Sequence, residues 1–374
     1  MLVQSGFGEK YMKYILHIAA KLDIGGAEKV ARDIGLYSDP DRYQHHYVVF
    51  WPEMGAYEPE ILDHGGKVFH IASPGKSYVK FLTELKRLMK DYPYTAVHAH
   101  TMFNAGWVML TAKIMKVPVR IAHAHSALNT GRQWKKALYE SVMRFLVLTC
   151  ATDLVACGEK AGIRLFGRKA YEKRARLILN GIDTERFRFD EESRNAMRKK
   201  LGLEGAFVIG HAGHFAKVKN QQYLLKLMPE ILKTKPNAKL LMLGDGADRP
   251  MLEKMVSELE LADAVIMTGN VMNVPDYLNA MDVFAFPSLY EGMPLSIVEV
   301  QTNGLPCILS TGVPEDVYLT DLVMALPLED PDKWAEAILG SRRSCSEKYA
   351  CILRNAGVDV SAAMGKIYEI YETN

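Results

Sequence analysis

The sequence lacks several signatures that identify common enzyme classes. It contains no GxxxxGK[ST] loop of phosphoryl-transfer NTPases, no GxGxxG turn of dinucleotide-binding dehydrogenases and no GxSxG elbow of hydrolases. Cysteine is scarce, with 5 residues in 374, and neither a CxxC pair nor a Cys/His zinc spacing occurs. We therefore expect buried free thiols in a reducing compartment, and no metal site built from cysteine.

Long apolar runs and a large excess of one charge are also missing. The longest apolar stretch, residues 145–157, contains Asp153 and is shorter than the ~20 residues of a membrane span. The net charge is +2, and no interleaved basic and aromatic pattern suggests a nucleic-acid surface. We expect a cytoplasmic protein that binds no nucleic acid. Met12 and Lys13 before an apolar run are typical of a chain start, so residues 1–11 are expected to be an extension.

The small net charge hides an asymmetry along the chain. Residues 1–170 hold 23 Lys and Arg against 15 Asp and Glu, whereas residues 171–374 hold 23 against 29. The first part is therefore basic, at +8, and the second acidic, at −6. This difference predicts two domains that meet different partners.

Apolar runs typical of buried strands alternate with helical patterns, and this alternation predicts βαβ units on parallel sheets. A charge-rich break at residues 167–206 separates two such series, so the pattern predicts two doubly wound domains with a cleft between them. Strands are expected at 14–19, 46–50, 96–99, 119–122 and 154–156, and then at 207–211, 239–243, 264–267, 283–286 and 306–309. Helices are expected at 27–37, 78–91, 105–115 and 134–148, and then at 220–232, 248–260, 273–280, 295–303 and 360–371.

The strongest local motif follows the expected strand that ends at Phe286. It reads PSLYEGMPLSIVE and places a glycine-containing turn before a helix. Free amides at such a helix start attract an anion, here those of Gly292, Met293 and Leu295. Glu291 and Glu299 would flank this turn and could accept hydrogen bonds from a sugar diol. The alternative is that both carboxylates are ordinary charges of a helix start and a helix surface.

Three weaker motifs follow other expected strands. Gly25 and Gly26 would let the backbone approach a ligand, as would Gly244. Lys217 and Lys219 leave the first strand of the second series and could neutralise a diphosphate. Each motif also fits an ordinary turn or a solvated charged loop.

Histidines end two neighbouring strands of the first series, as His98-Ala99-His100 and His123-Ala124-His125. We expect only one histidine of each pair to face the cleft, and no carboxylate or cysteine lies at ligand spacing nearby. A metal site is therefore disfavoured. A polar or catalytic role for one histidine is favoured, with strand-end hydrogen bonding as the alternative for at least two of them.

The order and spacing of these motifs resemble the retaining glycosyltransferases of glycosyltransferase family 4, over nearly the whole chain. The most specific element is Glu291-x7-Glu299 followed by Gly304-Leu305-Pro306. Within that family the HAHT, HAHS and VIGHAGHF segments are most similar to bacterial exopolysaccharide and capsule enzymes. The resemblance implies an α/β fold of the GT-B type, with two Rossmann-like domains. It implies an acceptor domain at 12–175, a donor domain at 176–355 and a helix at 356–374 that returns to the first domain.

The resemblance also implies a function and residue roles. The enzyme would move a sugar, with retention, from a nucleotide-diphosphate sugar to a glycan or lipid-linked acceptor, and no cofactor would be required. UDP-sugars are the common donors in the family. Glu291 would contact the donor sugar, and Glu299 the ribose. The remaining implied donor-side residues are His125 near the transferred sugar, and Lys219, His214, Gly292, Met293, Pro294, Leu295, Gly25, Gly26, Gly244, Asn270 and Val271. His98, His100 and Asn104 would lie on the acceptor side.

One residue departs from the family pattern, because His214 stands where an Arg is usual. Imidazole is charged only below a pKa near ~6.5, so donor binding could be weaker or pH-dependent. Two alternatives stay open: a nucleotide-sugar 2-epimerase, which shares the two-domain architecture, and a weakened nucleotide-sugar-binding subunit, which His214 best supports. The basic first domain, and the helix that begins at Trp134, would suit an anionic acceptor or an anionic membrane surface, although an ordinary packed helix explains the same pattern.

Overall fold

The structure is a computed structural model that describes residues 12–126, 134–344 and 346–373. The chain forms two compact units, which divide after Asn180 and after Val360. The first unit holds the chain up to Asn180 and from Ser361 onward, and the second holds Gly181–Val360. The expected extension at 1–11 lies outside the described residues.

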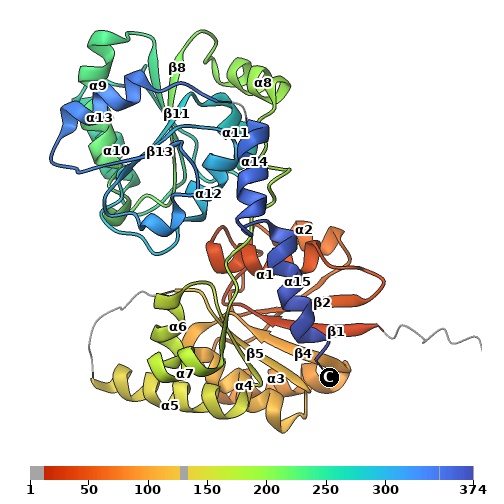
Figure 1. Ribbon diagram of the computed structural model, residues 1–374. Helices are drawn as coiled ribbons and strands as arrows, with labels where there is room; N and C mark the ends of the chain where they lie inside the picture. The colour runs from red at the N-terminus through yellow and green to blue at the C-terminus, as the bar shows by residue number, and fades with distance from the viewer. Residues whose placement is uncertain (1–11, 127–133, 345, 374) are drawn as a thin grey trace, which may run out of the picture. The chain divides into compact units, whose positions relative to one another are not determined.

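The first unit contains a parallel sheet of seven strands in the order β3-β2-β1-β4-β5-β6-β7 (Figure 1). Its strands are β1 (Lys13–Ile18), β2 (Tyr43–Val49), β3 (Lys67–His70), β4 (Tyr94–Ala99), β5 (Val119–Ala124), β6 (Asp153–Ala156) and β7 (Ala175–Leu177). Its helices are α1 (Gly26–Leu36), α2 (Glu58–Asp63), α3 (Tyr78–Asp91), η1 (Met102–Asn104), α4 (Ala105–Ile114), α5 (Trp134–Cys150), α6 (Glu159–Phe166), α7 (Arg168–Arg174) and α15 (Val360–Tyr371).

Alternate residues of these strands face two different layers. One face is apolar and packs on α3, α4, α5 and α6, with Phe81 and Leu85 fully buried in that core. The opposite face carries Tyr47, whose hydroxyl donates to the Ala31 carbonyl of α1 at 3.2 Å. This second face also carries most of the histidines of the unit, so the two faces differ in chemistry although both are buried.

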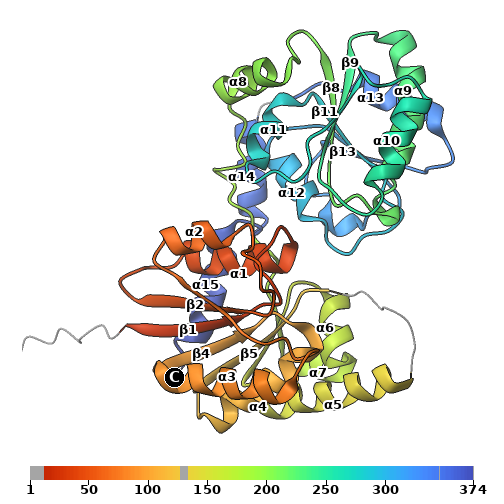
Figure 2. The same cartoon turned by 180° about the vertical axis from the view of Figure 1, so that it is seen from behind.

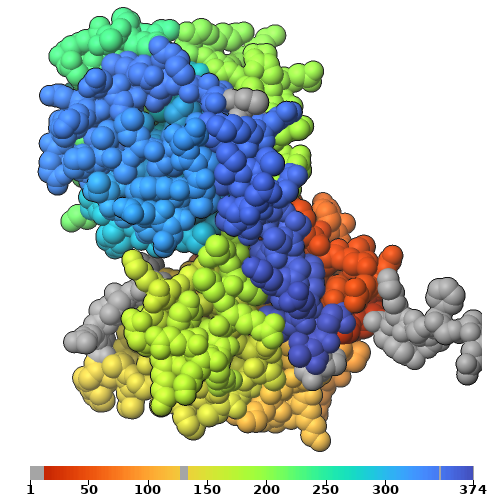
Figure 3. Space-filling model, viewed as in Figure 1, coloured from red at the N-terminus to blue at the C-terminus, as the bar shows by residue number. Residues whose placement is uncertain are grey.

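The last helix, α15, belongs to the first unit, as the sequence predicts. The Tyr371 hydroxyl lies 2.8 Å from Nδ1 of His98 on β4, and Lys13 Nζ donates to Oε2 of Glu372 at 2.7 Å. Figure 3 shows this dark blue helix lying directly against the red N-terminal segments of its unit. The helix thereby covers the histidine-bearing face of the sheet.

The second unit contains a parallel sheet of six strands in the order β10-β9-β8-β11-β12-β13. Its strands are β8 (Phe207–Ala212), β9 (Ala238–Leu243), β10 (Val265–Met267), β11 (Val283–Phe286), β12 (Cys307–Ser310) and β13 (Val323–Leu326). Its helices are α8 (Glu191–Leu201), η2 (Lys217–Lys219), α9 (Gln221–Thr234), α10 (Arg249–Glu258), α11 (Val274–Ala280), α12 (Leu295–Thr302), η3 (Glu315–Val317), α13 (Pro331–Gly340) and α14 (Ser346–Asn355).

Helices cover both faces of this sheet as well. Figure 2 shows α9, α10 and α13 on one side and α11 and α12 on the other. The first layer buries Trp334, and the second buries Phe284 and Phe286. The two doubly wound sheets predicted from the sequence are confirmed. Among the described residues, no helix is long and apolar enough to cross a membrane.

Candidate functional site

In each unit the strand order reverses at the first strand, and ligands of open parallel sheets bind beyond the carboxyl ends of strands at such a point. In the second unit the reversal lies between the neighbouring strands β8 and β11. The loops that leave them carry residues 213–219 and 287–294, which are the two motifs that the sequence singles out. The fold therefore places these motifs at one location.

The two charged residues of these loops contact each other directly. Lys219 Nζ lies 2.7 Å from Oε1 of Glu291, and the side chains are only 19% and 12% exposed. The ammonium also lies 4.7 Å from the ring centroid of Phe286, at the end of β11. A half-buried cation held between a carboxylate and an aromatic face can exchange the carboxylate for a stronger anion, because little water competes for it.

The turn before α12 leaves backbone donors free. Pro294 is the N-cap of this helix, and the amides of Gly292, Met293 and Leu295 have no hydrogen-bond acceptor among the described residues. A β-carbon built on Gly292 would meet nothing within 4 Å, so space is open beside this turn. These amides can bind an anion.

Glu299 lies one turn into α12 and is 9% exposed. It is therefore not a surface helix charge, which was the alternative for this residue. The Glu291 amide donates to the Gly312 carbonyl at 3.1 Å, and this bond fixes the loop that carries the Glu291 carboxylate. Gly312 follows the strand end at Ser310, which is the only sequence signal that it belongs to this location.

His211 is a buried residue of this location to which the sequence alone assigns no role. Its Nδ1 lies 3.0 Å from the Ala285 carbonyl, and its Nε2 is buried without a hydrogen-bond partner among the described residues. Burial lowers the pKa of His211 to about 4, so the ring is neutral at pH 7. Its position at the end of β8, directly before the glycine turn, is the signal that could have identified it.

His214, three residues further along the chain, is exposed, and its backbone carbonyl accepts a hydrogen bond from Gln221 at 3.1 Å. Its ring lies against Gly246, where an added β-carbon would come within 2.9 Å of Cε1. The ring therefore lies on the loop that follows β9, at the same edge of the sheet as Lys219.

Gly244 packs against the loop after β8. Its φ is +133°, and an added β-carbon would lie 2.1 Å from the Gly213 carbonyl oxygen. Its amide donates to Gly269 at 2.9 Å, which brings the end of β10 to the same edge. Asn270 and Val271 follow there, the first exposed and the second partly buried. Close packing of the loops thus accounts for a glycine at position 244.

The corresponding point of the first unit lies between β1 and β4, and the glycine turn after β1 leads into it. Gly25 is the N-cap of α1, with an extended φ of −172°, and Gly26 has no atom within 4 Å of an added β-carbon. Backbone access is therefore open at this turn. Asn104, at the end of η1, accepts a hydrogen bond from the Tyr139 hydroxyl at 2.6 Å.

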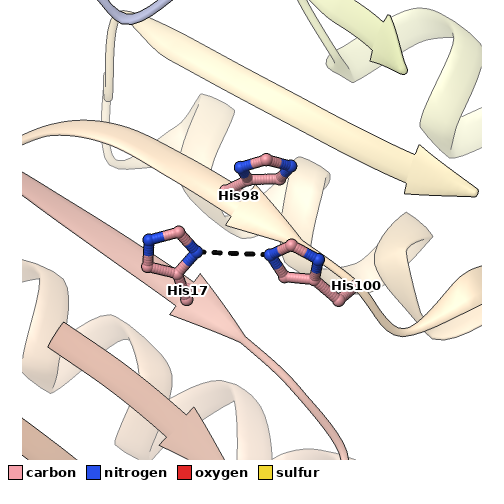
Figure 4. Close-up of side chains that lie close together, drawn as sticks. All are labelled: His17, His98 and His100. Atoms are coloured by element: carbon pink, nitrogen blue, oxygen red, sulfur yellow. Dashed lines mark hydrogen bonds between the residues drawn. The ribbon is translucent and has the colours of Figure 1, made fainter. Parts of the chain in front are cut away.

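The expectation that only one histidine of each pair faces the ligand edge is wrong. Residues two apart on a strand point to the same face. The rings of His98 and His100 are accordingly stacked with centroids 4.3 Å apart, and those of His123 and His125 lie 3.9 Å apart. His17 of β1 joins them, and Figure 4 shows its ring beside His98 and His100. His17 lies next to the end of β1, the strand that neighbours β4, and this position is the signal that could have identified it.

The nitrogens of these rings come within 4.8 Å in two groups, His17 with His98 and His100, and His100 with His123 and His125. Ligand lone pairs lie in the imidazole plane, so ligands of one ion need planes that converge on it. The planes of His17 and His98 are tilted from that of His100 by only 26° in each case. In this first group, nearly parallel rings favour hydrogen bonds between neighbours over a shared metal ion, whereas the planes of the second group differ by 26–39°.

The chain is similar to known proteins over nearly its whole length. A family model described as Glycosyltransferase Family 4 matches residues 24–186, and one described as Glycosyl transferases group 1 matches residues 193–340. The Bacillus subtilis (strain 168) protein EpsF, whose name describes it as a glycosyltransferase, is 34% identical over 369 residues, which is 96% of each chain. This chain belongs to glycosyltransferase family 4.

Two further proteins are similar to this glycosyltransferase. The UDP-Gal:α-D-GlcNAc-diphosphoundecaprenol α-1,3-galactosyltransferase of Escherichia coli is 30% identical over 240 residues, 62% of each chain. The crystal structure of Anabaena HepE (Alr3699) in complex with UDP-glucose has a TM-score of 0.76 and 20% identity, covering 96% of this chain and 100% of that chain. The fold is therefore GT-B, and the protein is a transferase of the EC 2.4 class.

Proposed function

We propose that this glycosyltransferase moves a hexosyl group from a UDP-sugar to a lipid-diphosphate-linked glycan in cell-surface polysaccharide synthesis, with retention of the anomeric configuration. The observation that carries the proposal is the half-buried contact between Lys219 and Glu291 beside the free amides before α12. Support comes from the printed name of the Escherichia coli relative, which contains UDP-Gal and a diphosphoundecaprenol acceptor, and from the UDP-glucose bound to HepE.

Breaking the sugar–phosphate bond puts positive charge on the anomeric carbon and negative charge on the leaving diphosphate. The bond between the anomeric carbon and the diphosphate oxygen breaks, and a new bond forms between that carbon and the acceptor oxygen. The leaving diphosphate becomes more negative, and the Lys219 ammonium and the free amides can stabilise it. The hydroxyl proton of the acceptor passes to the leaving phosphate, so no separate base is needed.

The remaining residue roles are part of the same proposal. Glu291 accepts hydrogen bonds from donor-sugar hydroxyls once Lys219 turns to the diphosphate, and Glu299 accepts them from the ribose. His125 contacts the transferred sugar. His98, His100 and Asn104 lie on the acceptor side, whereas the donor contacts are completed by Gly25, Gly26, His214, Gly244, Asn270, Val271 and the turn Gly292-Met293-Pro294-Leu295.

Donor binding is tested by thermal unfolding with UDP, GDP and ADP and with their sugars. A nucleotide at a hundred times its Kd stabilises the fold by about 2.7 kcal/mol, which raises the Tm by roughly 5–10 °C. We expect this shift with UDP and its loss in Lys219→Met. Lys226→Met is the matched control, because Lys226 is an exposed lysine of the neighbouring helix α9, outside these loops. A shift that survives Lys219→Met, or no shift with any nucleotide, contradicts the proposal.

Product analysis then separates this function from the alternatives. With a UDP-sugar alone, a transferase releases UDP and free sugar slowly, a 2-epimerase releases a rearranged nucleotide sugar, and a binding subunit releases nothing. We expect the first result, and acceleration when a lipid-diphosphate glycan is added. Because Lys219 and the amides stabilise the leaving group, we expect full activity in excess EDTA. Complete loss that only Mg²⁺ or Mn²⁺ restores contradicts this expectation.

We also propose that α5 contacts the anionic inner face of the plasma membrane, where such an acceptor resides. Four large apolar side chains form one stripe along this helix and are 46–74% exposed: Trp134, Leu138, Val142 and Phe145. Lys135 lies 5.6 Å from the Trp134 ring, which puts a cation beside the apolar stripe. Sedimentation with vesicles containing anionic lipid should fall in Leu138→Glu/Phe145→Glu and stay unchanged in Ser141→Glu, on the same helix. Equal sedimentation of all three proteins contradicts the contact.

A further inference from the structure

Four histidines form a continuous row across the first sheet. The row runs from His45 on β2 to His17 on β1, then to His100 after β4 and His125 after β5. Successive ring nitrogens are 2.9, 3.2 and 2.9 Å apart, and each contact joins Nδ1 of one ring to Nε2 of the next. All three distances are in the range of a hydrogen bond.

This pattern restricts where the protons can lie. Burial lowers the pKa of all four rings, so each is neutral at pH 7 and carries one N–H and one lone pair. Because every contact joins an Nδ1 to an Nε2, the three hydrogen bonds form together only when all four rings have the same tautomer. One ring in the other tautomer would place two N–H groups, or two lone pairs, against each other.

The two ends of the row are consequently linked. His45 Nε2 and His125 Nδ1 are buried and have no partner among the described residues. In one arrangement His125 presents an N–H and His45 a lone pair, and in the other the two are exchanged. A cavity of about 140 Å³ that His45 helps to line lies at one end. It can hold water, which needs ~10–15 Å³ and polar partners.

A second hydrogen-bonded row, formed by Tyr371, His98 and His123, packs against the first and restricts the orientation of its rings. The Tyr371 hydroxyl of α15 contacts Nδ1 of His98 at 2.8 Å, and His98 Nε2 lies 3.1 Å from His123 Nδ1. The His98 ring stacks on the His100 ring, and the centroids of the His123 and His125 rings are 3.9 Å apart. Stacking and hydrogen bonds together leave the His125 ring little rotational freedom.

We propose that His45, His17 and His100 are positioning residues that fix the tautomer and plane of His125, and thereby decide whether it donates to or accepts from a hydroxyl of the transferred sugar. This inference rests on the proposed function, in which His125 contacts that sugar. If the row reversed, the same hydroxyl would have to exchange the role of acceptor for that of donor, or the reverse, and its other hydrogen bonds would have to change with it. The row thus sets the orientation in which the sugar is held for transfer.

The row is tested by NMR of the full chain labelled with ¹⁵N-histidine, because a ring nitrogen with a proton and one with a lone pair have well separated shifts. Signals are assigned through single variants. We expect one common tautomer for the four rings and ¹⁵N–¹⁵N couplings across the three hydrogen bonds. Mixed tautomers in the wild type overturn the proposal. So does a spectrum that one equivalent of Zn²⁺ converts to metal-bound rings, because the nitrogens would then serve a metal site.

Kinetics test the consequence. His17→Phe keeps a buried aromatic ring but interrupts the row, whereas His17→Gln can still donate and accept. We expect kcat to fall at least tenfold in His17→Phe with the donor Kd changed less than twofold, and His17→Gln to recover most of kcat. The control is His46→Phe, because His46 is equally buried but bonds Tyr94 outside the row, at 2.8 Å. Equal kcat in His17→Phe and the wild type overturns the positioning role.

Two further results keep the outcomes separate. If His17→Phe does not fold, His17→Leu places a smaller apolar side chain at the same position, interrupts the row at the same point and is judged by the same criteria. The NMR spectrum needs no turnover, so a wild type with a uniform tautomer but no UDP binding contradicts the proposed function and leaves the hydrogen-bonded row standing. A uniform tautomer that persists at His125 after His17→Phe contradicts the coupling itself.

Discussion

Acidification from pH 7.5 to 5.5 should unfold the first unit while the second unit stays folded. Among the described residues, seven histidines of the first unit have a pKa lowered mainly by burial, and one histidine of the second unit does. The seven are His17, His45, His46, His98, His100, His123 and His125, and the one is His211.

The sign follows from which state binds more protons. A ring with a lowered folded pKa stays neutral in the fold, while the unfolded chain takes up a proton below a pKa of ~6.5. Its contribution to stability is therefore fully present above pH 6.5 and is lost as the pH falls toward the folded pKa. Carboxylates hardly titrate between pH 7.5 and 5.5, so histidines dominate this window.

The magnitude can be worked out for one ring. Between pH 7.5 and 5.5 a ring that stays neutral in the fold and titrates at ~6.5 in the unfolded chain loses about 1.4 kcal/mol of stability. Seven such rings lose about 10 kcal/mol, which is comparable with the whole stability of a domain, roughly 5–15 kcal/mol. His70 opposes the trend, because hydrogen bonds with Trp51 and Glu58 outweigh its burial and raise its pKa. The second unit loses only about 1.4 kcal/mol, through His211.

Hydrogen exchange followed by mass spectrometry resolves the two units, once rates are corrected for intrinsic pH dependence. Protection of β1, β4 and β5 should fall by at least three orders of magnitude between pH 7.5 and 5.5. Protection of β8 and β11 should fall about tenfold, the equivalent of 1.4 kcal/mol. His46→Gln should reduce the loss in the first unit by about tenfold, and His64→Gln, an exposed control, should not. A loss of tenfold or less in the first unit refutes the reasoning.

Three further predictions concern the second unit. Glu299→Gln should weaken UDP-sugar binding at least tenfold in calorimetry without lowering the urea midpoint. The reason is that a lost charge-assisted hydrogen bond is worth about 1.5–3 kcal/mol. An unchanged Kd would exclude a ribose contact. Gly244→Ala should lower the free energy of unfolding by roughly 2–4 kcal/mol, because its β-carbon would lie 2.1 Å from the Gly213 carbonyl oxygen. The control Gly292→Ala, where the β-carbon meets open space, should lower it by less than ~1 kcal/mol. Equal urea midpoints of the two variants would contradict this prediction. Arg343→Met should destabilise the unit by roughly 3–5 kcal/mol, because its guanidinium donates to the carbonyls of Leu278, Met281 and Asn303; a change in Tm below 2 °C would contradict that estimate.

The sequence predicted the central strands of both sheets because these strands are buried on both faces and read as continuous apolar runs. It missed the edge strands β3, β7 and β13, which are short and partly exposed, such as Ala175–Leu177. It also missed α8, a strongly polar helix that buries only Met197 and Arg198. That helix lies within the charge-rich break, where charge density was the only visible signal.

The candidate site was predictable where one short segment holds the relevant groups. Strand, glycine turn and helix start follow one another between Phe286 and Glu299, so local sequence sufficed to predict the free amides and the nearby carboxylates. The contact of Lys219 with Glu291 required the order of strands, because β8 and β11 become neighbours only after residues far apart in the chain pair. No periodicity in the sequence encodes which strands lie side by side.

The histidine row could likewise not be predicted from local sequence alone. Each HxH pair can be seen in the sequence. Because side chains two residues apart on a strand point to the same face, both rings of a pair lie on one face of the sheet. The sequence does not show which rings bond across the strands. His17 lies opposite His98 in the strand register, but it bonds His45 and His100, each of which is two residues away from the residue opposite His17. Such a row exists only because four strands are aligned to within one residue. Since a shift of one residue would move a ring to the opposite face, the same precision of register that builds the core also determines the proton arrangement at His125.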